Sequence, residues 1–234
     1  MSSRPERMGA AQYPFTVPAL QGGIDLPFPS PVTFLVGENG SGKSTLLEAI
    51  AECCGFNPEG GSRDHQRPAD AEPSALASAL RLAWLPKVSD GFFLRAESFF
   101  NFATYLDGVS TLELYGGRSL HAQSYGESFL ALFANRFSQG LFHLDEQEAA
   151  LSPQRQLAFL RVIHDLTTSG RGQFIIATHS PILLAFPAAT LYSFSDQGIQ
   201  TIAFSDCEHV QLTRNFLNAP DRFLSVLFAA DPQP

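Results

Sequence analysis

Eight residues, from Gly37 to Ser44, combine glycines, a lysine and a hydroxyl at the spacing G-x-x-x-x-G-K-[ST]. In such a loop the glycines let backbone N–H groups turn inward around an anion. The lysine reaches the outer phosphates of a nucleotide, and the serine hydroxyl binds Mg²⁺. The apolar run 32–36 before the loop and the helical pattern 43–55 after it are the context that this motif requires. The sequence therefore predicts a phosphate-binding loop made of Gly37, Glu38, Asn39, Gly40, Ser41, Gly42, Lys43, Ser44 and Thr45.

A second apolar run, residues 141–146 with the sequence LFHLDE, ends in the acidic pair Asp145 and Glu146. Downstream of a phosphate-binding loop, the first acid is expected to hold Mg²⁺, usually through water, so Ser44 and Asp145 form the predicted metal site. Glu146 is expected to orient or deprotonate the water that attacks the phosphate. His143 lies within the same run, and we interpret it as a packed or partly exposed side chain and not as a ligand.

Two further segments place polar residues where a phosphate group can bind. The third apolar run, residues 173–178, is followed by His179, and a side chain just past a core strand lies where α/β sheets bind their ligands. We expect His179 to donate a hydrogen bond to the terminal phosphate. The segment SYGES supplies Ser124, Gly126 and Glu127 just ahead of a helical pattern, whose N-terminal end attracts anions.

Strands that alternate with helices must position these groups. Besides the three apolar runs, residues 91–96 (GFFLRA) predict a strand, while residues 74–84 (SALASALRLAW) and 127–137 (ESFLALFANRF) predict helices. Such an alternation is typical of a mostly parallel sheet that is covered on both faces by helices. The predicted fold class is therefore α/β.

Local signals bound several other elements. Ser152 and Pro153 occupy the N-cap and first position of a helix that Gly170 is expected to end. Prolines and glycines interrupt residues 13–28, which suggests small edge strands and turns. Residues 1–12 are expected to form a flexible polar tail, followed by a single domain over residues 13–234.

Composition excludes several classes of function. The chain has 234 residues, a formal net charge of −8 and 44% hydrophobic residues, which indicates an ordinary globular core and argues against a broad, non-specific grip on nucleic acid. Three cysteines, two of them adjacent, form no disulfide framework. The N-terminal residues lack an apolar signal core and no apolar run reaches the length of a membrane span, so we expect a cytoplasmic protein without direct membrane insertion.

In their order along the chain, the phosphate-binding loop, the S-x-G-E segment, the acidic pair and His179 resemble the motifs of the ABC-type ATPases, and the chain is similar to small stand-alone bacterial ATPases described as AAA or ABC-like. The resemblance runs from about Tyr13 to Phe228 and depends mostly on the segments GFFLRAESFFN, YGGRSLHAQSYGESFLALF and ALSPQRQLAFL. It implies a P-loop NTPase fold with a small N-terminal β part and a short helical subdomain at roughly 57–138. It also implies ATP and Mg²⁺ as cofactors, and an ATP-dependent homodimer in which Ser124 and Gly126 of one chain complete the site around Lys43 of the other.

This sequence departs from the ABC-type pattern at two places. Gln147 stands where proline usually follows the acidic pair, and this change is expected to alter loop stiffness more than chemistry. Transporter ATPases have a glutamine after the strand that corresponds to residues 91–96. This sequence has no glutamine there, and the candidates to replace it are Glu97, Ser98 and Asn101. An aromatic that stacks on adenine is also expected upstream of the loop, and the candidates are Tyr13, Phe15 and Phe28.

Three functions remain open from the sequence. The interval between Lys43 and Ser124 shows no heptad pattern, which excludes the long coiled coil of SMC-type ATPases. The favoured function is an ATPase that dimerises on ATP and acts on an unidentified protein or nucleic-acid partner, in nucleic-acid metabolism or defence. One alternative is the ATP-binding subunit of a membrane transporter with a separate permease, and another is an ATP-dependent interaction module with little turnover.

Overall fold

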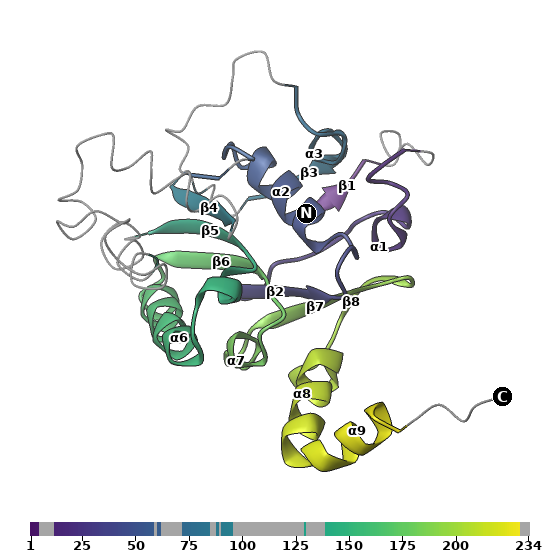
Figure 1. Ribbon diagram of the computed structural model, residues 1–234. Helices are drawn as coiled ribbons and strands as arrows, with labels where there is room; N and C mark the ends of the chain where they lie inside the picture. Colours follow the sequence, from purple (N-terminus) through teal and green to yellow (C-terminus); the bar gives the residue numbers. More distant parts are fainter. Residues whose placement is uncertain are drawn as a thin grey trace, which may run out of the picture.

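A six-stranded sheet forms the centre of the molecule (Figure 1). In the computed structural model, the described residues are 1–4, 12–58, 60–61, 72–84, 88, 90–95, 129 and 139–229. The strand order is β4-β5-β6-β2-β7-β8. Neighbouring strands run parallel except for β8, which is antiparallel to β7. The prediction of an α/β fold with a mostly parallel sheet is confirmed. The strands are β2 (Val32–Gly37), β4 (Gly91–Arg95), β5 (Gly140–Asp145), β6 (Gly172–Ala177), β7 (Thr190–Ser195) and β8 (Gly198–Thr201).

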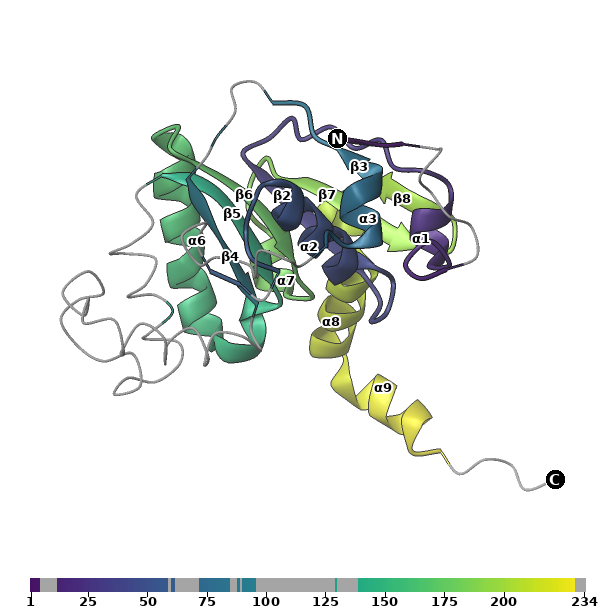
Figure 2. The ribbon, with the colours of Figure 1, turned by 90° about the horizontal axis from the view of Figure 1, so that it is seen from above.

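Helices cover both faces of this sheet, as Figures 1 and 2 show. One face carries α2 (Lys43–Cys53), together with the short helices α1 (Pro18–Gln21) and α3 (Ala75–Ala79). The opposite face carries α6 (Pro153–Thr168) and α7 (Pro181–Leu184). The sheet is thus buried on both sides, which explains why its central strands read as continuous apolar runs in the sequence.

Side chains of successive strand residues point to opposite faces, so each central strand contributes to two cores. In β2, Val32, Phe34 and Val36 pack into the cluster that contains α6, whereas Leu35 packs into the cluster that contains α2. Phe34 and Leu35 are fully buried. The loop after β2 is therefore anchored by a strand that is fixed on both faces.

Two helices, α8 (Glu208–Asn218) and α9 (Pro220–Leu227), come last among the described elements and project away from the sheet (Figures 1 and 2). The 3₁₀ turn Phe204–Asp206 precedes α8, and another 3₁₀ turn, Gln147–Ala150, follows β5. Within the described part of the chain, no helix has the length and apolar character needed to cross a membrane.

The residues predicted to begin and end a helix at 153–170 do so in α6. Ser152 caps the helix, and its hydroxyl accepts a hydrogen bond from the backbone N–H of Arg155 at 3.4 Å. Pro153 occupies the first helical position. The helix ends at Thr168, and Gly170 follows with φ +68°, the left-handed conformation that glycine adopts without strain.

Three expectations about the periphery differ from the structure. Residues 13–28 contain the helix α1 in place of small edge strands, with only an isolated bridge between Ser2 and Asp25. The helix expected at 74–84 is confined to α3, because Leu80–Arg81 forms the strand β3. Ser2–Ser3 (β1) pairs with this strand in a two-stranded sheet, so residues 1–4 are not a free tail. Strand pairing between distant segments has here overridden the helical pattern.

The predicted helix at 127–137 and most of the helical subdomain expected at 57–138 lie outside the described residues. The strand expected at 91–96 is present as β4, and the strands expected at 141–146 and 173–178 are present as β5 and β6.

Candidate active site

The phosphate-binding loop connects β2 to α2 at the carboxyl end of the sheet. Gly37 has φ +147°, and a Cβ at this position would lie 2.6 Å from the backbone oxygen of Phe194 on β7. Gly42 has φ +97° and precedes the first helical residue, Lys43. Both glycines are thus required by the backbone itself, because a larger residue would be strained and, at Gly37, would clash.

Lys43 is buried at the centre of this loop, with 3% of its surface exposed. Its Nζ donates to the carbonyl oxygens of Gly37 and Glu38, at 2.8 and 2.9 Å. Burial lowers the pKa of Lys43, while the nearby carboxylates, led by Glu146 and Asp145, act in the opposite direction. The loop therefore holds a buried ammonium whose present partners are two carbonyl groups.

Ser44 and Asp145 meet beside this lysine, as the sequence predicted. The Ser44 hydroxyl donates to Asp145 Oδ1 at 2.9 Å, and Asp145 is buried at the end of β5. A hydroxyl and a carboxylate oxygen are the hard donors that Mg²⁺ prefers, and Mg²⁺ is usually bound by one or two such groups plus phosphate oxygens and water. The described residues contain no cluster of three His, Cys, Asp or Glu that could hold a metal alone.

Glu146 follows Asp145 in the left-handed conformation, with φ 52° and ψ 40°. Its backbone N–H donates to Ala177 O at the end of β6 at 2.9 Å, which fixes this turn against the neighbouring strand. The side chain remains 43% exposed, and its Oε1 lies 3.3 Å from His179 Nε2. A non-glycine residue with positive φ is uncommon, and this one directs the candidate base away from the sheet and into the open site.

His179 lies directly after β6, and its ring contacts a second histidine. Its backbone N–H donates to Glu148 Oε1 at 2.5 Å, and its Nδ1 is 2.9 Å from Nε2 of His209 on α8. Its Nε2 is buried and forms no hydrogen bond with the described residues. Burial lowers the pKa of His179, and the charges of Lys43 and His209 lower it further.

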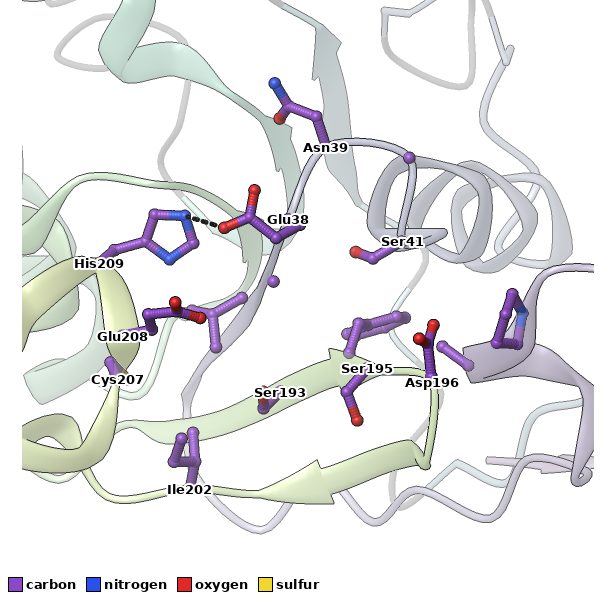
Figure 3. A pocket seen from close by; sticks show the side chains of 16 residues that line it. Glu38, Asn39, Ser41, Ser193, Ser195, Asp196, Ile202, Cys207, Glu208 and His209 are labelled. Atoms are coloured by element: carbon purple, nitrogen blue, oxygen red, sulfur yellow. Dashed lines mark ion pairs between the residues drawn. The ribbon is translucent and has the colours of Figure 1, made fainter. Parts of the chain in front are cut away.

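His209 and Glu38 both line a pocket of about 440 Å³, and Figure 3 shows their side chains pointing toward one another. His209 Nε2 lies 3.8 Å from Glu38 Oε1. Sequence reasoning did not identify His209, because no motif marks the first turn of α8. It also left Glu148 without a role, and burial raises the pKa of this carboxyl group.

The three candidate aromatics are placed very differently. Phe15 is buried in the core, and Phe28 packs edge-on against Tyr192 with ring centroids 6.4 Å apart. Tyr13 is 69% exposed, and its hydroxyl is 2.8 Å from Thr45 Oγ1. Tyr13 also lines a pocket of about 220 Å³ together with Lys43 and other loop residues. Of the three, Tyr13 alone lies beside the phosphate-binding loop.

Of the two places where the sequence departs from the ABC-type pattern, the structure describes the first, Gln147. The side chain of Gln147 is fully buried and donates to the carbonyl oxygens of Leu94 and Asp145, at 2.9 and 3.0 Å. It therefore ties the ends of β4 and β5 together. Arg95, the last residue of β4, forms an ion pair with Glu48 and has its Nε 4.0 Å from Asp145 Oδ2.

His143 is fully buried, which confirms its interpretation as a packed side chain.

Several predicted site residues cannot be placed relative to these groups. Ser124, Gly126 and Glu127 lie outside the described residues, as do Glu97, Ser98 and Asn101. The structure therefore brings together the loop, Asp145, Glu146 and His179, and it leaves the S-x-G-E segment as a prediction.

Comparison with known proteins identifies one family. Residues 17–81 match the family described as AAA domain, a stretch that includes the phosphate-binding loop and all of α2. No curated protein has significant sequence similarity to the chain.

Three solved structures resemble the chain in part. One is cbiO1 from Clostridium perfringens, which is part of the ABC transporter complex cbiONQ. It shares 15% sequence identity with this chain at a TM-score of 0.47, and the match covers 88% of this chain and 91% of cbiO1. The SMC head domain from Thermotoga maritima has 18% sequence identity and a TM-score of 0.42, and the match covers 76% of this chain and 91% of that domain. The dimeric structure of MJ0796, a bacterial ABC transporter cassette, has 16% identity and a TM-score of 0.42, over 76% and 87%.

The family match covers the same residues whose geometry forms the phosphate-binding loop. That loop joins a central strand of a mostly parallel sheet to a helix that covers it. Residues 17–81 thus match the AAA domain family, and their geometry is that of a phosphate-binding loop between a central strand and a helix.

Proposed function

We propose that this protein binds ATP with Mg²⁺ and hydrolyses the bond between its β- and γ-phosphates. The observation that carries the proposal is the hydrogen bond of 2.9 Å between Ser44 and Asp145, with Lys43 buried beside it. These groups come from α2 and β5, which are distant in the sequence, and they meet at the edge of the sheet where α/β proteins bind ligands. The arrangement combines a cation, a pair of hard oxygen donors and a backbone loop suited to phosphate.

Each group has a distinct part in the reaction. Lys43 would exchange its two carbonyl contacts for oxygens of the β- and γ-phosphates. Ser44 and Asp145 would hold Mg²⁺, which when bound neutralises charge on the phosphates. Glu146 would accept the proton of a water molecule whose oxygen forms the new bond to the γ-phosphorus, while the bond to the bridging oxygen of ADP breaks. The buried Nε2 of His179 would donate to the departing phosphate.

We also propose that a second copy of the chain closes the site during turnover. The carboxylates of Glu38 and Glu146 are 78% and 43% exposed, so the described residues leave the site open to solvent. Hydrolysis by a positioned water is favoured when bulk water is excluded. Ser124, Gly126 and Glu127 of the partner, at the predicted start of a helix, would supply the missing contacts to the γ-phosphate.

Phosphate release and the mass in solution, both measured with ATP and Mg²⁺, test these two proposals together. Glu146→Gln should retain nucleotide binding, lower turnover by about 10²- to 10⁴-fold as expected for loss of a general base, and accumulate as a dimer. Lys43→Ala should lose nucleotide binding. Asp165→Asn, which changes an exposed carboxylate on α6, serves as the matched control and should behave as the wild type. Unchanged turnover in Glu146→Gln would contradict the role given to Glu146, and a monomer under all conditions would contradict closure by a second copy.

The same assay separates the alternatives. An interaction module would bind ATP with no turnover in the wild type, and Glu146→Gln would then change nothing. A transporter subunit would hydrolyse ATP and would in addition co-purify with a separate permease. Binding of nucleic acid that requires ATP and weakens with salt would favour a role in nucleic-acid metabolism.

A further inference from the structure

Among the described residues, His209 makes the shortest hydrogen-bond contact to the ring of the candidate catalytic histidine. Its Nε2 lies 2.9 Å from Nδ1 of His179, with the two rings at an interplanar angle of 67° and their centroids 4.7 Å apart. His209 belongs to the first turn of α8, far along the sequence from the motifs that form the site. Both side chains are about a quarter exposed, so the pair lies at the wall of the site and not on the open surface.

The protons of this pair can be assigned from its neighbours. A neutral imidazole carries one N–H and one acceptor nitrogen, so one ring of the pair must donate to the other. His179 Nε2 lies 3.3 Å from Glu146 Oε1, and His209 Nε2 lies 3.8 Å from Glu38 Oε1. Each carboxylate favours an N–H on the nitrogen that faces it.

Both carboxylates therefore favour the same arrangement. His209 carries its proton on Nε2 and donates it to Nδ1 of His179, which leaves the proton of His179 on Nε2. The opposite arrangement would turn the Nε2 lone pair of His179 toward Glu146, and it would leave His209 Nε2, 3.8 Å from Glu38 Oε1, without a proton. In the favoured state the Nε2–H of His179 faces Glu146 Oε1 at 3.3 Å, and this proton would turn to a phosphate oxygen when nucleotide is bound.

We propose that His209 is a positioning residue that holds His179 in the tautomer able to donate to the γ-phosphate. This role rests on the proposed ATP hydrolysis, because a wrongly protonated His179 would present a lone pair to a phosphate oxygen. The partner of a functional histidine fixes both its tautomer and its ring orientation. The first turn of α8 thus takes part in the chemistry of a site whose other groups come from α2 and from the ends of β5 and β6.

Two substitutions of His209 separate donation from packing. Gln carries an amide N–H₂ at about the reach of imidazole Nε2 and can replace the donor, whereas Phe keeps a ring and removes the donor. We expect His209→Phe to lower kcat by about 10- to 100-fold, the usual effect of losing such a partner, with less than about a threefold change in KM and in affinity for a non-hydrolysable ATP analogue. His209→Gln should keep kcat within about fivefold of the wild type.

The tautomer can be read directly from the ring ¹⁵N chemical shifts of His179, assigned by comparison with His179→Gln in the nucleotide-free protein. Wild type and His209→Gln should show the proton on Nε2. In His209→Phe only Glu146 still favours this tautomer, so a population with the proton on Nδ1 should appear beside it. An unchanged tautomer in His209→Phe, or an equal loss of kcat in both variants, would overturn the proposal. Absence of ATP hydrolysis in the wild type would instead refute the proposed function, while the ¹⁵N shifts would still report on the pair.

Discussion

Replacing His143 should change how the stability of the protein depends on pH. This residue is fully buried on β5, packed edge-on against Phe56 and Phe93 with ring centroids 5.4 and 6.4 Å away. Its Nδ1 has no hydrogen-bond partner in the described part of the chain. Burial lowers the pKa of His143 from 6.5 to about 3, because the charged imidazolium would lie among apolar groups.

The sign and size of the effect follow from the two pKa values. Below pH 6.5 the unfolded chain binds a proton at this residue, while the folded protein does not until the pH approaches about 3. The contribution of neutral His143 to the free energy of unfolding is therefore at its full value above pH 6.5. It falls as the pH drops from there toward 3, by up to about 1.4 kcal/mol per pH unit. Between pH 8 and pH 5 the loss due to His143 is about 2 kcal/mol.

Urea unfolding of the wild type and of His143→Leu at pH 8, 7, 6 and 5 measures this contribution. Leucine cannot titrate and keeps the site apolar, so the free energy of unfolding of the variant should fall by about 2 kcal/mol less than that of the wild type over this range. Comparing changes with pH cancels the effect of lost packing, which is the same at every pH. Parallel curves for the two proteins would show that His143 does not titrate as its burial requires.

Substitutions at three other positions give separate outcomes. Gly37→Ala should destabilise the protein by about 1–3 kcal/mol and weaken nucleotide binding, because its Cβ would lie 2.6 Å from Phe194 O, and thermal unfolding with and without ATP measures both effects. Tyr13→Ala should weaken binding of a fluorescent ATP analogue by about tenfold through lost stacking, while Tyr13→Phe should bind nearly normally; equal binding by all three proteins would exclude Tyr13 as the adenine platform. Ser152→Ala should cost about 1 kcal/mol in urea unfolding without changing ATP affinity, since it removes only the cap of α6.

The parts of the site that could be predicted are those with strong local signals. A parallel strand buried on both faces appears as an apolar run, so the residues just after β2, β5 and β6 could be recognised from the sequence. Their closeness followed from the rule that parallel strands end at one edge of a sheet. The contact between Ser44 and Asp145 is the clearest result of that reasoning.

Contacts that depend on the path of the chain could not be predicted. His209 reaches His179 because the β7–β8 hairpin and the following 3₁₀ turn return the chain to the site, and no residue pattern encodes that return. The buried amide of Gln147 is another example, since a glutamine after an acidic pair looks like a solvent-exposed loop residue. At the N-terminus, the pairing of Ser2–Ser3 with Leu80–Arg81 could not be read from two short segments with no strand pattern.

The position of β2 in the sheet has a consequence for how the chain folds during synthesis. This strand and its phosphate-binding loop leave the ribosome early, yet its two partners in the sheet, β6 and β7, begin only at Gly172 and Thr190. Until these strands are made, the apolar face residues and unpaired backbone of β2 have no lasting partner. Pairing over such a distance along the chain is slow, and a waiting strand of this kind is prone to aggregation. Production of the protein should therefore depend strongly on temperature and on chaperones that shield this one segment.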